Sequence, residues 1–127
     1  MQKKHIQIII PCYNERDNIK VLYQAIKTVF DESELKEKYT HSFIFVDDGS
    51  SDGSKTLLQE LSSEHTNIHF LSFSRNFGHQ LAVKAGLDYT TGDAVISMDA
   101  DMQHPPHLIP TLLQKWEEGN QVVATLR

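Results

Sequence analysis

The sequence is poor in cysteine and has only short apolar runs. Cys12 is the single cysteine among 127 residues, so it cannot form an internal disulfide. It also lacks the second cysteine that a CxxC zinc or redox site needs. We therefore expect Cys12 to be a small buried side chain. The apolar runs are a handful of residues long, and a membrane-spanning helix needs about 20.

Clusters of basic residues are also absent. The chain has 12 lysines and arginines against 17 acidic residues, a formal net charge of −5. This balance argues against nucleic acid as a partner. An anionic ligand would need local help from a metal ion or from helix N-termini. The stretch Met1–His5 has no signal-peptide apolar core, so we expect a cytoplasmic chain.

Glycine-rich nucleotide fingerprints are missing as well. Gly49 and Gly53 are separated by three residues, and no stretch matches the dinucleotide fingerprint or the Walker A loop. NAD-dependent and ordinary P-loop chemistry are therefore disfavoured.

What the sequence does contain is a regular alternation of strand-like and helical patterns. Strands are expected over 6–10, 42–46, 68–73, 94–98 and 121–125. This alternation predicts one α/β domain with a mainly parallel sheet flanked by helices. The first, second and fourth runs are almost continuously apolar, which is typical of strands covered on both faces.

Helices are expected between these strands. The first should begin near Asn14, as N-cap, and continue through an apolar stripe from Ile19 to Phe30. A short helix after Ser51–Ser54 should bury Leu57, Leu58 and Leu61. A third is expected over 79–90, where Ala82, Ala85 and Gly86 allow close packing. The last should follow Pro105–Pro106 and stop at Gly119. The charged run 31–38 is expected to be a solvated surface segment.

Polar residues follow three of the apolar runs directly. They are Pro11–Glu15, Asp47–Asp48 and Asp99–Asp101. In a parallel α/β sheet the carboxyl ends of the strands lie along one edge, where ligands bind at the switch point of strand order. The sequence therefore predicts one shared site.

The Asp99-Ala100-Asp101 element predicts a divalent metal site. Two nearby carboxylates repel each other, and Mg²⁺ or Mn²⁺ relieves this while leaving positions for phosphate oxygens. Gln103 could add a carbonyl oxygen. The metal would stabilise a departing nucleoside diphosphate. The alternative is a polar turn in which Asp99 caps the next element.

The other two segments could contact a nucleotide. A carboxylate at Asp47 or Asp48 could accept hydrogen bonds from a base or ribose, and the ring of Tyr13 could stack on a base. The alternatives are a strand-to-helix turn capped by Ser51–Gly53, simple packing of Tyr13, and a surface role for Glu15 at a helix start. Arg75, after the third strand, could meet phosphate or carboxylate.

These segments together resemble family 2 glycosyltransferases. The matching stretches are Ile8–Glu15, Phe45–Gly53, Ser74–Gly78 and Met98–Pro106, in the family's order and spacing. They are most similar to the branch of dolichyl-phosphate mannosyltransferase and the polyprenyl-phosphate glycosyltransferases. The resemblance implies the Rossmann-like GT-A fold, a nucleotide-diphosphate-sugar donor, Mg²⁺ or Mn²⁺, and inversion at the anomeric carbon.

The resemblance also implies roles for individual residues. Residues implied in binding the donor substrate are Pro11, Tyr13, Glu15, Val46, Asp47, Asp48, Arg75, Asp99, Ala100 and Arg127. The implied metal ligands are Asp99, Asp101 and Gln103. The catalytic residue stays unassigned, because a general base, if the reaction uses one, is expected beyond Arg127.

On this reading residues 1–127 are the donor-binding half of a glycosyltransferase domain, truncated at the C-terminus, and the acceptor half is absent. The expected acceptor is a polyprenyl phosphate in cell-wall or surface polysaccharide synthesis, or a saccharide. Membrane contact, at the inner face of the cell membrane, is expected through the missing C-terminal region. Formation of a homo-oligomer is left open.

Three other readings remain at this stage. One is a phosphohydrolase with Asp99 as nucleophile and Asp101 as acid or base. Another is a receiver-like domain that accepts phosphate on Asp99. The third is a nucleotide-binding fragment without activity.

Overall fold

The computed structural model describes residues 3–100, 106–119 and 124–126. The strands, in chain order, are β1 (Lys4–Cys12), β2 (Tyr39–Asp47), β3 (Ile68–Ser72), β4 (Ala94–Met98) and β5 (Ala124–Leu126). The helices are α1 (Arg16–Asp31), α2 (Ser33–Lys38), α3 (Ser54–Glu64), α4 (His79–Tyr89), the 3₁₀ turn η1 (Pro106–Leu108) and α5 (Ile109–Glu117).

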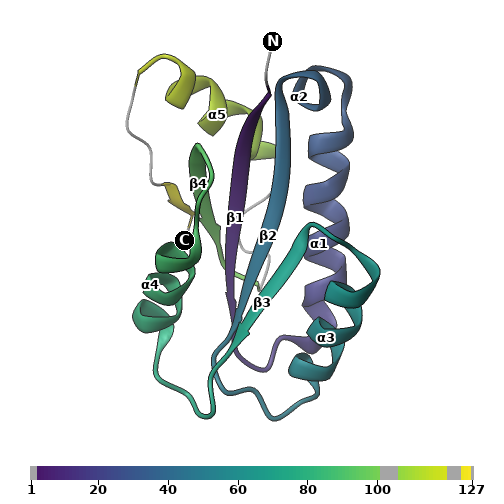
Figure 1. Cartoon of the computed structure of the whole chain (residues 1–127), viewed down its shortest axis with the longest axis vertical. Helices are drawn as coiled ribbons and strands as arrows, with labels where there is room; N and C mark the ends of the chain where they lie inside the picture. The colour runs from purple at the N-terminus through teal and green to yellow at the C-terminus, as the bar shows by residue number, and fades with distance from the viewer. Residues whose placement is uncertain (1–2, 101–105, 120–123, 127) are drawn as a thin grey trace.

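The strands form one parallel sheet in the order β3-β2-β1-β4-β5. Successive strands move outward from β1 to β3, and the chain then returns to the other side of β1 to form β4. The switch point of the sheet therefore lies between β1 and β4. The expected mainly parallel α/β sheet is confirmed (Figure 1).

The two faces of the sheet are covered unequally. Alternate residues of β1 face α1, α3 and α5 and form the larger core cluster, which includes Ile8 and Phe43. The smaller cluster contains Ile9, Ile44, Val46 and Ala82 and lies under α4. Period-two alternation along each strand sends neighbouring side chains to opposite faces, so both faces of β1 are apolar.

A hydrogen-bond network of polar side chains joins β1, β2 and the turn before β4. It lies toward the amino ends of these strands. The side-chain carbonyl of Gln7 accepts the backbone N–H groups of Thr91 and Gly92, both at 2.7 Å. Its amide donates to Ser42 Oγ at 3.3 Å, and the same hydroxyl lies 2.9 Å from His5 Nε2. Gln7 is buried, so its hydrogen-bonding groups are satisfied by the protein rather than by bulk water.

One expectation about local structure is corrected. Helix α1 begins at Arg16 rather than at an Asn14 cap, because the Asp52 carboxylate accepts the Arg16 N–H at 3.0 Å. Asn14 instead adopts a left-handed φ of 54°. The charged run 31–38 is mostly exposed, as expected for a surface segment, and it also contains a helix, α2, which the absence of an apolar stripe did not indicate.

The remaining helices agree closely with expectation. Helix α4 covers 79–89, and Leu58 and Leu61 of α3 are buried while Leu57 is partly buried. Gly119 follows α5 with a φ of 96°, and its N–H reaches the Trp116 carbonyl at 3.0 Å. The last strand is seen over 124–126 rather than 121–125, and residues 120–123 lie outside the described part of the chain.

Candidate active site

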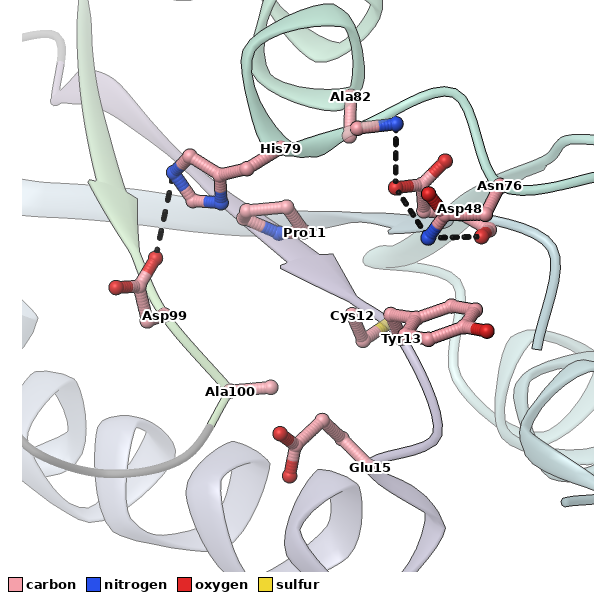
Figure 2. Close-up of a pocket in the computed structure, with 11 residues that line it drawn as sticks. Pro11, Cys12, Tyr13, Glu15, Asp48, Asn76, His79, Ala82, Asp99 and Ala100 are labelled. Atoms are coloured by element: carbon pink, nitrogen blue, oxygen red, sulfur yellow. Dashed lines mark hydrogen bonds and ion pairs between the residues drawn. The ribbon is translucent and has the colours of Figure 1, made fainter.

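A pocket of about 350 Å³ lies at the switch point of the sheet. Its lining comes from the ends of β1, β2 and β4 and from the start of α4 (Figure 2). The lining residues are Pro11, Cys12, Tyr13, Glu15, Asp48, Asn76, Gly78, His79, Ala82, Asp99 and Ala100. Three segments far apart in the sequence therefore meet, as their positions after parallel strands predict.

Six of the residues expected to bind substrate line this pocket: Pro11, Tyr13, Glu15, Asp48, Asp99 and Ala100. Tyr13 is 48% exposed, so its ring is not held by core packing and is free to meet a ligand. Asp99 has a partly exposed carboxylate at the end of β4. The roles of these residues in binding stay predictions, but the structure brings them together.

Three other expected residues lie outside the lining. The Val46 side chain is buried in the cluster under α4, because alternation along β2 directs it there. Asp47 is also buried, where its carboxylate accepts the Ser50 N–H at 3.2 Å and the Ser72 hydroxyl at 3.3 Å. Arg75 is placed with its guanidinium carbon 4.8 Å from the centre of the Phe77 ring. Their expected contacts with substrate stay predictions without support from this geometry.

Asp101, Gln103 and Arg127 lie outside the described residues. Of the expected metal ligands, only Asp99 can therefore be placed. Within residues 3–100, 106–119 and 124–126, no three histidine, cysteine or acidic side chains come together as a metal site. The oxygen donors of Glu15 and Asp99 nevertheless line one pocket, and carboxylate oxygens are the ligands that Mg²⁺ and Mn²⁺ prefer. The residues present fit such an ion.

Most of the ionisable side chains that line the pocket are acidic. Three carboxylates, from Glu15, Asp48 and Asp99, line the pocket together with one imidazole, from His79. Lysine and arginine are absent from the described lining. A diphosphate entering alone would meet more negative than positive charge. A divalent cation between the phosphates and the carboxylates would reverse this repulsion.

The turns at the pocket are held by side chains of the same loops. The Asn14 amide oxygen accepts the Ser51 N–H at 2.8 Å, and the Asn14 N–H donates to the Ser50 hydroxyl at 2.9 Å. Asp52 joins the starts of α1 and α3 through the N–H groups of Arg16 and Ser54, both at 3.0 Å. Burial acts to raise the pKa of Asp52, but the hydrogen bond from the Ser54 hydroxyl, together with the two N–H groups, outweighs it and holds the pKa below its usual range.

Five lining residues were not assigned a substrate role from the sequence. They are Cys12, Asn76, Gly78, His79 and Ala82. Cys12 is buried, as expected, and burial raises its pKa strongly, with further contributions from the carboxylates of Asp47 and Glu15. Its thiol stays protonated and donates weakly to the Val46 carbonyl at 3.5 Å. His79 could have been predicted to lie in the site, because it is the first residue of the helix that follows β3.

Among the described residues, no helix is both long and apolar enough to cross a membrane. This finding agrees with the short apolar runs of the sequence.

Solved structures share this fold. The mannosyltransferase PcManGT from Pyrobaculum calidifontis, solved with GDP-Man and Mn²⁺, superposes with a TM-score of 0.61 at 21% identity, over 80% of this chain and 28% of that one. Glucosyl-3-phosphoglycerate synthase from Mycobacterium tuberculosis, solved with Mn²⁺, UDP and glucosyl-3-phosphoglycerate, gives 0.66 at 22% identity, over 89% and 39%. At these identities the likeness establishes the fold.

Relatives found by sequence have a higher identity to this chain than these solved structures do. An uncharacterized glycosyltransferase of Bacillus subtilis, YkcC, is 45% identical over 98% of this chain and 38% of its own length. The bactoprenol glucosyl transferase of Shigella phage SfX is 41% identical over 96% of this chain and 39% of its own length. The chain thus spans under two fifths of these relatives.

The family model described as "Glycosyl transferase family 2" matches residues 7–127. This range contains every strand end that contributes to the pocket. The resemblance seen in the sequence is confirmed, and the chain belongs to glycosyl transferase family 2.

Proposed function

We propose that this chain is the donor-binding part of an inverting glycosyltransferase that uses a UDP- or GDP-sugar together with Mg²⁺ or Mn²⁺. The observation that carries the proposal is the meeting of Tyr13, Glu15 and Asp99 in one pocket at the β1/β4 switch point. In this arrangement the Tyr13 ring stacks on the base. We assign Asp99 to the diphosphate and metal ion, together with Asp101 and Gln103, whose roles come from the family resemblance.

The proposed acceptor is a polyprenyl phosphate in cell-wall or surface polysaccharide synthesis. Support comes from the relatives named as bactoprenol glucosyl transferases. A lipid phosphate is already ionised near neutral pH, so attack on the sugar needs alignment rather than a proton acceptor. We place the acceptor-binding and membrane-contacting parts beyond Arg127, at the inner membrane face. A saccharide acceptor would instead need a carboxylate base.

A bound divalent ion would neutralise the charge that develops on the departing nucleoside diphosphate. The chain's own residues do the rest of the work on the donor. The pocket lining supplies an aromatic surface for the base, and the carboxylates at the ends of β1 and β4 hold the cation-bound diphosphate. Buried Pro11 and Ala82 give this part of the pocket an apolar lining.

The test is calorimetric titration of the chain with UDP and with GDP, each with Mn²⁺ and with EDTA. We expect one nucleotide to bind with Mn²⁺ and its affinity to fall at least about tenfold in EDTA or in Asp101→Ala. The matched control is Asp88→Ala, which removes an exposed carboxylate paired with Lys84 on α4 and should bind as the wild type does.

Equal binding by wild type and Asp101→Ala in EDTA would contradict the proposal. Formation of an acyl phosphate on Asp99 from a small phosphodonor would instead favour the phosphohydrolase or receiver reading.

A further inference from the structure

The carboxylate of Asp48 is occupied by a single loop. Its Oδ1 accepts the Phe77 N–H at 2.7 Å, and its Oδ2 accepts the Gly78 N–H at 3.0 Å and the Asn76 amide at 3.2 Å. Asp48 is only 4% exposed. A carboxylate with both oxygens engaged in this way is oriented toward the loop.

A second observation joins the same two segments. The backbone of Gly49 lies against the backbone of residues 75–76, and a Cβ at Gly49 would meet Arg75 C at 2.2 Å and Asn76 N at 2.4 Å. Its φ of 77° is in the left-handed region. Only glycine fits both conditions. The turn after β2 and the loop before α4 are therefore held together by packing as well as by hydrogen bonds.

This loop decides where α4 begins. Gly78 directly precedes His79, the first residue of α4, whose Nε2 lies 3.6 Å from Asp99 Oδ1 across the pocket (Figure 2). The His79 side chain is 41% exposed, so surrounding packing does not fix it. Its position opposite Asp99 follows from the position of the helix start.

We propose that Asp48 and His79 are positioning residues for the Asp99 carboxylate. Asp48 fixes the loop that starts α4, and His79 at that start holds Asp99 toward the pocket. This positioning role of Asp48 is separate from the direct base or ribose contact expected from the sequence, which stays a prediction. The ligand that Asp99 then receives rests on the proposed function, whereas the coupling between Asp48, His79 and Asp99 does not.

The coupling is tested without ligand or metal. In chains carrying ¹⁵N-labelled histidine at one fixed pH, His79→Gln identifies the His79 ring signals. We expect Asp48→Asn and Asp99→Asn each to move these signals. Asp31→Asn, which alters an exposed carboxylate paired with Lys27 on α1, should leave them in place. Amide exchange over residues 77–82 should rise about tenfold or more in Asp48→Asn, because a carboxylate–amide hydrogen bond is lost.

The consequence for the site is tested with Mn²⁺ and UDP, and with Mn²⁺ and GDP. His79→Ala should weaken Mn²⁺-dependent nucleotide binding about tenfold. His79→Gln, whose amide can donate to Asp99, should retain most of it. His79 is exposed, so these variants test the inference even if Asp48→Asn does not fold. The double variant Asp48→Asn/His79→Ala should bind no more weakly than the weaker single variant.

The inference is overturned if the His79 ring signals move in neither Asp48→Asn nor Asp99→Asn. It is also overturned if the losses of nucleotide binding in Asp48→Asn and His79→Ala add in the double variant. If wild type binds neither nucleotide with Mn²⁺, the proposed function fails. The ring signals and amide exchange then still decide the positioning roles.

Discussion

His41 on β2 is an imidazole held between aromatic rings. Its ring stacks on Phe30 with centroids 4.5 Å apart and planes 9° apart, and it meets Phe43 edge-on at 5.5 Å. Its Nε2 is buried without a hydrogen-bond partner among the described residues. Burial lowers the pKa of His41, and the nearby Asp31 carboxylate offsets this only in part. The folded protein therefore keeps this ring neutral.

We expect His41→Phe to stabilise the protein, and to do so more at pH 5 than at pH 8. Unfolded His41 takes up a proton below about pH 6.5, whereas the folded ring does so only at lower pH. Between these values the unfolded state binds more protons, so stability is lost as the pH falls. The gain at pH 5 should be about 1 kcal/mol or more, measured by urea unfolding. A gain of equal size at both pH values would contradict a lowered pKa.

At the scale of single elements, α4 lies unusually close to the sheet. A Cβ on Gly86 would meet Ile9 Cγ2 at 2.6 Å, so the helix rests on β1 with no room for a methyl group. Ala82 on the same face is fully buried. The small residues of 79–90 predicted this close packing from the sequence, and the structure confirms it.

We expect Gly86→Ala to destabilise the protein by about 1–3 kcal/mol, because overpacking exceeds the gain of about 1 kcal/mol from helix propensity. Thermal unfolding of Gly86→Ala, Ile9→Ala and the double variant measures the coupling. In the Ile9→Ala background the added methyl has space, so Gly86→Ala should cost much less. The same cost in both backgrounds would mean that the helix shifts freely.

The strands and helices were predictable because the spacing of apolar residues along the sequence decides which of the two forms. The apolar runs gave β1, β2 and β4, and the spacing of Ile19, Leu22 and Ile26 gave α1. Side-chain partners were less predictable because they depend on distant loops. The sequence around Asn14 does not show that Asp52 caps α1 instead. Nor does the sequence around Asp48 show that its carboxylate accepts hydrogen bonds from the loop 76–78. The sequence predicted that these strand ends lie together, and they do line one pocket, whereas the direction of each side chain needed the fold.

At the scale of the whole molecule, β1 is the centre of the structure. It pairs with β2 on one side and β4 on the other, and Ile6, Ile8, Ile9 and Ile10 are inaccessible to solvent. By contrast, β3 has a strand on only one side in the described sheet, and several of its residues are partly exposed. Local stability should therefore fall from β1 outward.

Hydrogen–deuterium exchange with peptide resolution should follow this order. Amides of residues 6–10 and 43–46 should exchange last, close to the rate set by global unfolding, and those of α2 should exchange first. Amides of β3 should fall between these limits. Protection of β3 equal to that of β1 would show that the sheet opens only as one unit.

The buried amide of Gln7 has a consequence far from where it lies. By bonding to the turn before β4 and to Ser42 of β2, it ties together the beginnings of three neighbouring strands. Sliding β4 by one residue past β1 would break those bonds and turn Asp99 to the opposite side of the sheet. The alignment of the two strand tips that line the pocket is thus set in part by a glutamine at their other ends.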